Sequence, residues 1–204
     1  PMSFTGRTFN HVTWPELEVL MLFDERDQPF YLLTGPEPDF QWRRFVVAVE
    51  RLITDLGVTL VVTGQGVPWA APHTRPLRRL THASRDELIG DRATWIQQVR
   101  VPGYAAAILE MRLAATGVDT ISQSVQVPHY LTDLTFPTAS VSLLDGWADV
   151  TGLTLPHGQL EDLGLAVMAQ VEQQTRNSAE LTHAVSDLER AYDNDLTHQA
   201  GSLW

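Results

Sequence analysis

Hydrophobic and polar positions divide the first sixty residues into two strands, a helix and a third strand. Apolar runs at 17–23 and 30–34, separated by a short polar turn, predict a β-hairpin. Residues 42–56 carry apolar side chains at spacings of three and four and stop at a glycine, which predicts an amphipathic helix. A strand over 58–63 follows. Because short loops join strand, helix and strand, we expect a βαβ unit in which 30–34 and 58–63 lie parallel.

The same patterns continue as far as residue 152, after an irregular lead-in expected at residues 1–15. We expect strands at 78–83, 95–101 and 120–127, a short helix at 85–88, and longer helices at 104–116 and 139–151. Strands that alternate with helices are typical of the α/β class. The sequence therefore predicts a three-layer α/β/α fold with a mostly parallel sheet.

The pattern changes at residue 159, where two helical stripes replace the strands. The stripes consist of Leu160, Leu163, Val167 and Val171, followed by Leu181, Val185, Leu188 and Tyr192. Asn177 with Glu180 three residues later resembles a capping box, so we expect two helices and not one rod. Eight acidic residues and two arginines make this segment strongly negative. We expect residues 1–158 to form an α/β core, and 159–204 a C-terminal helical extension of the same domain.

Composition narrows the classes of function. The chain has 204 residues, of which 44% are hydrophobic, and these suffice for one domain. A net charge of −11 argues against nucleic-acid and membrane-surface binding, which need basic patches. Without cysteine and lysine, the chain lacks thiolate metal sites, Schiff-base catalysis and the Walker-type nucleotide loop. No membrane-spanning run or signal peptide is visible, so we expect a cytoplasmic protein.

The stretch 59–76 is the strongest candidate for a functional site. We expect its strand to break at Gly64 and Gly66 and to continue as a proline-bounded loop that holds His73 and Arg75. In one interpretation Arg75 binds an anion and His73 acts as acid or base. In the other, which we favour, the loop is a rigid connection and Arg75 pairs with a carboxylate such as Glu37.

A second histidine occupies a similar place. His129 follows the strand predicted at 120–127, so it could lie beside His73, but no third metal ligand can be identified. Glu37 and Asp39 could act as paired carboxylates, although Asp39 is better explained as the N-cap of the helix at 42–56.

Three proline-bounded segments, 35–39, 64–76 and 127–130, follow predicted strands. Because the carboxyl ends of parallel strands meet at one edge of a sheet, we expect these segments to converge on a common rim.

Three motifs, in this order and spacing, resemble those of the PAC2 family, which is named for a proteasome assembly chaperone. They are Gly-Pro-Glu-Pro-Asp at 35–39 with Trp-Arg-Arg-Phe at 42–45, Pro-His-Thr-Arg-Pro at 72–76, and Val-Pro-His-Tyr-Leu at 127–131. The likeness is to the actinobacterial branch and covers nearly the whole chain. Members usually open with a strand and a Gly-Trp-Asn-Asp-Ala-Gly-like loop, so we expect that N-terminal strand to be missing here.

The resemblance implies a phosphorylase-like fold and a role in protein–protein interaction. It implies a homo-oligomer, of which a trimer is the favoured form, and possibly a proteasome-related partner. It supplies no catalytic residues, cofactor or metal. We therefore expect a non-enzymatic oligomeric interaction or chaperone-like module. The alternative is a small-molecule enzyme of phosphorylase or hydrolase type, with His73, Arg75, His129 and Glu37 at the strand-end loops.

Overall fold

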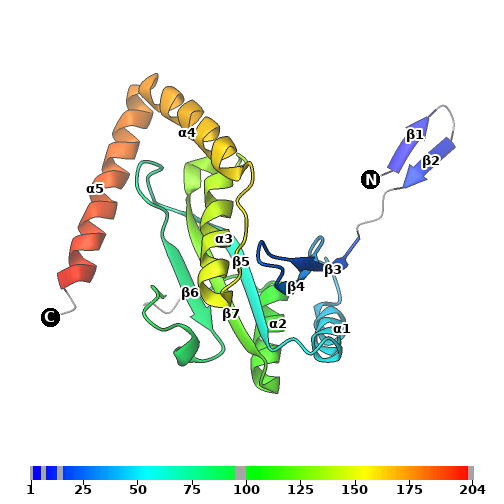
Figure 1. The fold of residues 1–204 in the computed structure, drawn as a ribbon. Helices are drawn as coiled ribbons and strands as arrows, with labels where there is room; N and C mark the ends of the chain where they lie inside the picture. The colour runs from blue at the N-terminus through cyan, green and yellow to red at the C-terminus, as the bar shows by residue number, and fades with distance from the viewer. Residues whose placement is uncertain (1, 6–7, 13–15, 95–99, 202–204) are drawn as a thin grey trace.

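The computed structural model describes residues 2–5, 8–12, 16–94 and 100–201 (Figure 1). Its strands are β1 (Met2–Thr5), β2 (Thr8–Val12), β3 (Glu18–Phe23), β4 (Pro29–Thr34), β5 (Leu60–Trp69), β6 (Arg79–Ala83) and β7 (Asp119–Pro128). Its α-helices are α1 (Trp42–Asp55), α2 (Ala105–Thr116), α3 (Pro137–Thr151), α4 (Leu160–Arg176) and α5 (Ala179–Gly201), with short 3-10 helices η1 (Asp86–Leu88) and η2 (His129–Leu131). The predicted α/β class and the C-terminal pair of helices are confirmed.

The central sheet is mixed and has the strand order β5-β7-β6. β5 runs parallel to β7, and β6 runs antiparallel to it on the other side. In the parallel pair, residue 69 of β5 lies opposite residue 128 of β7. The segments that follow these two strands therefore begin at the same end of the sheet, and this end holds the candidate site.

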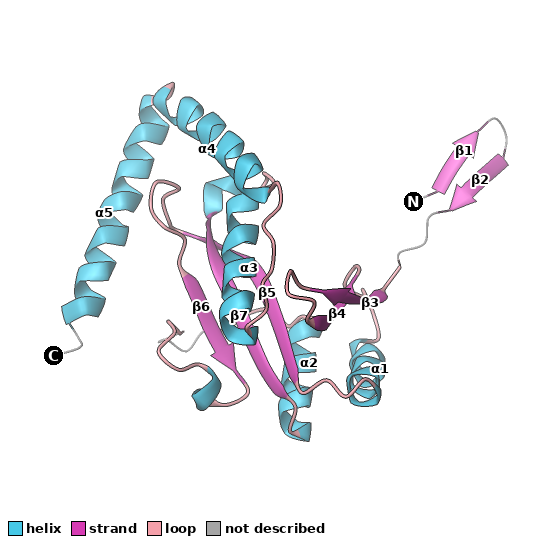
Figure 2. Ribbon diagram, viewed as in Figure 1, coloured by secondary structure: helices cyan, strands magenta, loops and turns pink. Residues whose placement is uncertain are grey.

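Helices cover both faces of this sheet, which gives three layers (Figure 2). On one face, Val125 and Val127 of β7 pack with Ala139 and Leu143 of α3. On the opposite side, α1 and α2 enclose a second cluster made of Val46, Val49, Ile53, Leu109 and Leu113. Alternate residues of a strand point to opposite faces, so each face of β7 is covered by a different layer.

The predicted βαβ unit was wrong in its first strand. Among the described strands, β4 pairs with β3 alone, antiparallel, in a two-stranded sheet separate from the central one. The parallel pair is instead β5 and β7, and the chain between them passes through β6 and α2. Periodicity identified the hairpin and helix α1 correctly, but it cannot tell which strands share a sheet, because long-range contacts decide that.

β5 does not break at Gly64 and Gly66, contrary to the prediction. The strand continues to Trp69, and both glycines lie inside it. A Cβ at Gly64 would lie 2.8 Å from Leu143 Cδ2 and 2.9 Å from Trp147 Nε1, both on α3. Glycine here therefore permits close packing between strand and helix and does not end the strand.

Two predicted helix caps shift to neighbouring residues. Gln41 precedes α1 instead of Asp39, because the indole N–H of Trp42 donates to the carbonyl of Pro38, 2.6 Å away, and folds the preceding residues into a turn. Asn177 ends α4, and Ser178 is the residue whose Oγ accepts a hydrogen bond from the N–H of Leu181 in α5, at 3.3 Å. The break between α4 and α5 is nevertheless where it was expected.

The N-terminal lead-in was expected to be irregular, but β1 and β2 pair as an antiparallel hairpin. Most of the strand expected at 95–101 lies outside the described residues. Among the helices that are described, none is both long and apolar enough to cross a membrane.

Candidate functional site

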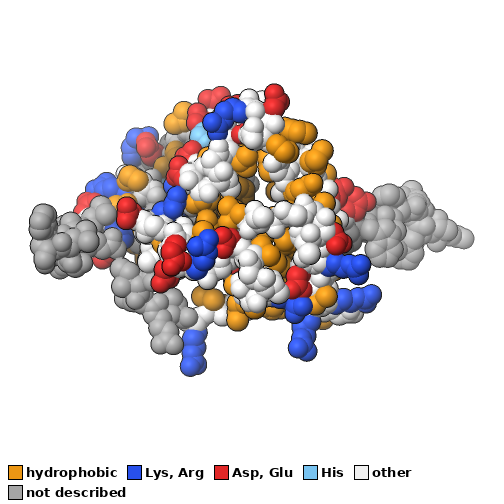
Figure 3. Space-filling view, turned by 60° about the horizontal axis from the view of Figure 1, so that its bottom comes forward, with side chains coloured by type: hydrophobic (Ala, Val, Ile, Leu, Met, Phe, Trp, Pro, Cys, Tyr) orange, Lys and Arg blue, Asp and Glu red, His pale blue; other side chains and the backbone are white. Residues whose placement is uncertain are grey.

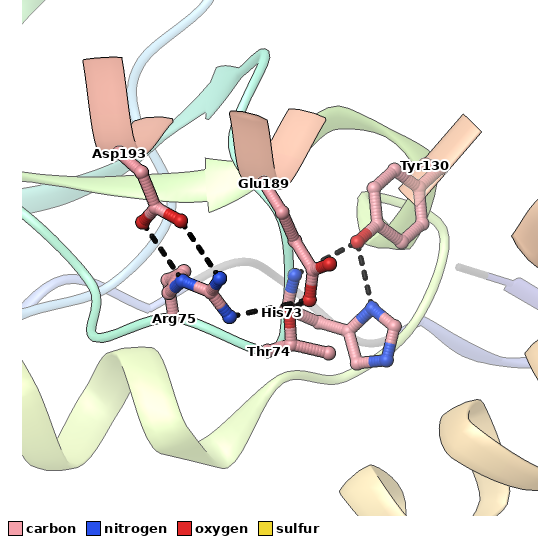
Figure 4. A network of polar contacts seen from close by, with 6 residues as sticks. All are labelled: His73, Thr74, Arg75, Tyr130, Glu189 and Asp193. Carbon is pink, nitrogen blue, oxygen red and sulfur yellow. Dashed lines mark hydrogen bonds and ion pairs between the residues drawn. The ribbon is translucent and has the colours of Figure 1, made fainter. Parts of the chain in front are cut away.

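The strand-end rim, which we define as residues 72–78 and 128–130, lies where β5 and β7 end together. The hydroxyl of Tyr130 accepts a hydrogen bond from the backbone N–H of His73 at 2.8 Å and lies 2.7 Å from Nδ1 of the same residue (Figure 4). The ring of His129 also meets the Tyr130 ring edge-on, at 5.5 Å between centroids. The two histidines expected to lie together are therefore neighbours through Tyr130.

Burial controls the protonation of this pair. His73 is buried, and desolvation lowers the pKa of its imidazole, although Glu172 and Glu189 oppose the shift. Desolvation likewise raises the pKa of the Tyr130 phenol. With the imidazole neutral, the phenol can donate to Nδ1 while it accepts the His73 amide proton, so both groups are satisfied inside the fold.

Arg75 binds α5 and not Glu37, contrary to the prediction. Its Nε and Nη2 donate to the two oxygens of Asp193, each at 2.9 Å, and its Nη1 donates to Glu189 at 3.2 Å (Figure 4). The hydrogen bond that Arg75 donates to Asp193 raises the pKa of Arg75, and the guanidinium in turn lowers the pKa of Asp193. The two-pronged geometry matches a guanidinium to a carboxylate, so the sites that an anion would use are occupied.

Tyr192 of α5 completes the contact with the strand-end rim. Its hydroxyl donates to the carbonyl of Pro76 at 2.9 Å, and its buried ring lies under the Arg78 guanidinium, 4.4 Å from Cζ to the ring centroid. Arg78 also donates to the Tyr192 carbonyl at 3.2 Å and lies 3.7 Å from Asp195. One face of α5 therefore presents an aromatic ring between carboxylates to two arginines of the rim.

The third predicted segment, 35–39, does not join the other two. Glu37 accepts a hydrogen bond from the backbone N–H of Ala105, at the first turn of α2, where a negative charge is favourable. Tyr104, the residue before Ala105, accepts a hydrogen bond from the side chain of Gln65, which lies in the middle of β5 and away from the strand end. Of the four candidate residues, His73, Arg75 and His129 lie at the rim and Glu37 lies elsewhere.

The acidic and histidine side chains do not form a recognisable metal site. In the part of the chain that the structure describes, no group of three or more such side chains is close enough to hold a metal ion.

A second surface stands out on the β3–β4 hairpin. Cross-strand neighbours Val19–Leu33, Met21–Tyr31 and Phe23–Pro29 put six apolar side chains on one side of the two strands, and we call this the hairpin face. All six are exposed, Met21 to 58% and Phe23 to 57%. Hydrophobic side chains also reach the surface at several places in Figure 3, between charged ones. Contiguous apolar patches of this kind usually mark a surface that another molecule covers.

The tip of this hairpin is fixed to the body, so the hairpin face is held in one place. Asp24 is buried and accepts hydrogen bonds from the N–H groups of Arg26, Gln28 and Thr154, each at 2.8 Å. These hydrogen bonds lower the pKa of Asp24, and the bond from Thr154 has the largest effect. A two-stranded sheet is marginal alone, and this anchor to the α3–α4 connection compensates in part.

Sequence reasoning found the strands of the hairpin but not its exposed face. It placed segment 127–130 at the rim, but it missed Glu189, Tyr192 and Asp193 as residues that contact the rim. The exposed face had a signal, since residues 19–23 and 29–33 are apolar at almost every position and a half-buried strand would alternate. The acidic residues of α5 had none beyond their helical spacing.

Comparison with known proteins assigns the chain to a protein family. The sequence profile of the PAC2 family matches residues 1–175, and the chain belongs to this family. No functionally curated protein matches it.

Solved structures of actinobacterial proteins are similar to it. The Mycobacterium tuberculosis protein Rv2714, of unknown function, is 39% identical with a TM-score of 0.91, over 98% of this chain and 68% of its own. A Corynebacterium glutamicum protein of unknown function is 31% identical with a TM-score of 0.88, over 96% and 72%. The Mycobacterium tuberculosis proteasome-assembly chaperone homologue Rv2125 is 22% identical with a TM-score of 0.80, over 90% and 78%, a likeness that shows the shared fold.

Proposed function

We propose that this protein is a non-enzymatic, oligomeric protein-interaction module of the chaperone type. The observation that carries the proposal is the hairpin face, six exposed apolar side chains on two paired strands with a fixed anchor. None of the contacts made by the described residues covers it. Burial of this face in an assembly would remove its apolar area from water. This would stabilise the assembly by about 25 cal/mol for each Å² of apolar area buried.

We assign a second copy of the chain as the first occupant of the hairpin face. The face has no charged side chain, so a copy of itself is a chemically matched partner, and two-fold pairing of identical patches is the commonest symmetric arrangement. The family resemblance implies a trimer, which is the other oligomeric state to be tested. Either assembly would also protect the free edges of a two-stranded sheet from uncontrolled pairing.

A proteasome-related protein is the partner we propose beyond the homo-oligomer. The support is family membership together with a similar fold in a protein described as a proteasome-assembly chaperone homologue. A partner of this kind would place the protein in the cytoplasm.

The enzymatic alternative is less well supported at the strand-end rim. Arg75, which would bind an anionic substrate, already has two carboxylates, and Glu37 lies away from His73 and His129. The rim is better explained as a contact between parts of the protein.

Sedimentation velocity of the full chain tests the proposal. The variant carrying Met21→Glu and Tyr31→Glu places two charges on the hairpin face, and we expect it to lose association through this face and to sediment as a smaller species than the original chain. Met111→Glu is the matched control, because Met111 is 75% exposed on α2, away from the hairpin. A monomeric original chain, or an oligomer whose size is unchanged by both charges, would contradict the assignment of the hairpin face.

The proteasome partner is tested separately. A purified actinobacterial proteasome core particle, added to the full chain, should comigrate with it in sedimentation, and the double-charge variant should bind less. If the core particle sediments alone while the chain still forms its oligomer, the proteasome-related partner is wrong and the interaction module stands.

A further inference from the structure

The strand-end rim binds an acidic helix, α5, through a small set of side chains on that helix. Glu189, Tyr192 and Asp193 follow one another at spacings of three and one residues, so their side chains lie on one face of α5. Glu189 and Asp193 bind Arg75, and the ring of Tyr192 packs against Arg78. The contact involves one face of α5 and does not depend on how α5 is connected to the rest of its chain. The same face, offered by another copy, would fit equally well.

The connection between α4 and α5 is short and already close to helical. It consists of Asn177 and Ser178 and contains neither glycine nor proline. Asn177 has helical dihedral angles (φ −83°, ψ −4°), and its N–H donates to the carbonyl of Gln173 at 3.2 Å, as in a continuing α-helix. Asn177 and Ser178 are therefore the residues at which the two helices could join.

A joined helix over residues 160–201 would be about 60 Å long at 1.5 Å per residue. In the single chain α5 folds back from the end of α4 toward the body, as the two helices in Figure 1 show, and reaches its own rim. Straightening would carry α5 away from that rim and toward a neighbouring molecule. Short connections of this kind are the usual hinges of domain swapping.

Exposed leucines at the start of α4 and the start of α5 also favour a second arm. Leu163, Leu165 and Leu181 are exposed in the single chain, although Leu163 and Leu181 belong to the apolar stripes of α4 and α5. Two straightened arms lying side by side would cover side chains of these stripes, which the bent form leaves in water.

We propose that α5 is exchanged between two copies of the chain, so that Glu189, Tyr192 and Asp193 of one copy bind Arg75 and Arg78 of the other, with Asn177 and Ser178 as the hinge. In the bent form each chain fills its own rim. In the exchanged form the contacts are the same, and the two copies are linked by both arms. This inference is independent of the hairpin face.

Charge complementation in the full chain tests the exchange. One chain carries Arg75→Glu and a second carries Asp193→Arg, so that each alone sets like charges against each other. In an exchanged heterodimer, Glu at 75 meets Arg at 193 in one contact and the native pair forms in the other. Both chains also carry Met21→Glu, which removes association through the hairpin face. Native mass spectrometry of the mixture should show heterodimers exceeding homodimers by roughly tenfold or more.

Two further variants keep the test decisive. A single chain with both Arg75→Glu and Asp193→Arg should be more stable than either single variant, which shows that the reversed pair forms, although the new carboxylate still faces Glu189. Ala179→Pro suits the first turn of α5 but cannot continue a helix, so it should abolish the heterodimer. A mixture that stays monomeric, heterodimers at the statistical ratio, or heterodimers that persist with Ala179→Pro would each overturn the exchange.

Discussion

The strand-end rim and the hairpin face differ in how their side chains are satisfied. At the rim, every arginine that faces α5 has a carboxylate or carbonyl partner within the chain. On the hairpin face, apolar side chains have no described neighbour to cover them. Charged contacts are directional and are completed inside the fold, whereas apolar area remains available to another molecule. The comparison supports the hairpin face as the proposed interaction surface and shows the rim to be the attachment of α5.

The two regions also differ in the forces that hold them. The rim depends on ion pairs and hydrogen bonds, which salt and pH weaken. An assembly through the hairpin face would depend on apolar burial, which salt leaves intact or strengthens. Mutation, salt and pH can therefore separate them.

The largest effect is expected from Tyr192→Ala in α5. Removing this buried ring eliminates its packing against Arg78 and its bond to Pro76, and should destabilise the docking of α5 by about 3 kcal/mol. Hydrogen exchange of residues 179–195 should rise by two orders of magnitude while the central sheet stays protected. Tyr192→Phe, which keeps the ring, should cost about 1 kcal/mol. Unchanged exchange in α5 with Tyr192→Ala would show that the rim does not hold this helix.

A smaller effect is expected from Arg75→Ala. The loss of the two-pronged contact with Asp193 should reduce the free energy of unfolding by about 1 kcal/mol, since both groups are partly exposed. Urea denaturation at 0.05 and 0.5 M NaCl should show the difference shrinking with salt. Arg51→Ala is the control, because the pair of Arg51 with Asp55 is mostly exposed. An equal loss in both variants would mean that the rim contact is an ordinary surface pair.

Acidification should weaken the rim through His73. Burial lowers the pKa of its imidazole, so below the unfolded value of 6.5 the unfolded chain binds the proton first. The stability contribution is complete above pH 6.5 and is lost as the pH falls through the folded pKa. Between pH 7.5 and 5.5, the Tm of the original chain should fall more than that of His73→Asn. The same slope in both would exclude His73 as the cause.

The smallest effect on stability is expected on the hairpin face itself. Met21→Glu should change the free energy of unfolding of the dilute chain by less than about 0.5 kcal/mol, because the side chain is already exposed. Urea denaturation at low protein concentration measures this. A loss of more than 2 kcal/mol would mean that Met21 supports the fold of the single chain.

Local elements were predictable from the sequence because short-range patterns determine them. The hairpin of β3 and β4, helix α1, and the division into α4 and α5 all follow from periodicity and turn residues. The same holds for Gly117, which ends α2 in the left-handed conformation.

Contacts between distant segments could not be predicted in this way. Arg75 and Asp193 are 118 residues apart, and spacing says nothing about which of many carboxylates an arginine will meet. The glycines of β5 were misinterpreted because their neighbours on α3 come from a later part of the sequence. Polar residues stand at every second position of β7 from Thr120 to Gln126, as in a half-exposed strand, yet Ser122 and Ser124 among them are buried, since helices cover both faces.

Oxidation of methionine tests the central claim, that the hairpin face is covered in the assembled protein. Met21 and Met111 are both exposed in the single chain and react with peroxide at similar rates if nothing covers them. At concentrations where the protein is an oligomer, we predict that Met21 is protected at least tenfold while Met111 still reacts, and that dilution removes the protection. Equal oxidation of the two methionines in the oligomer would contradict the claim.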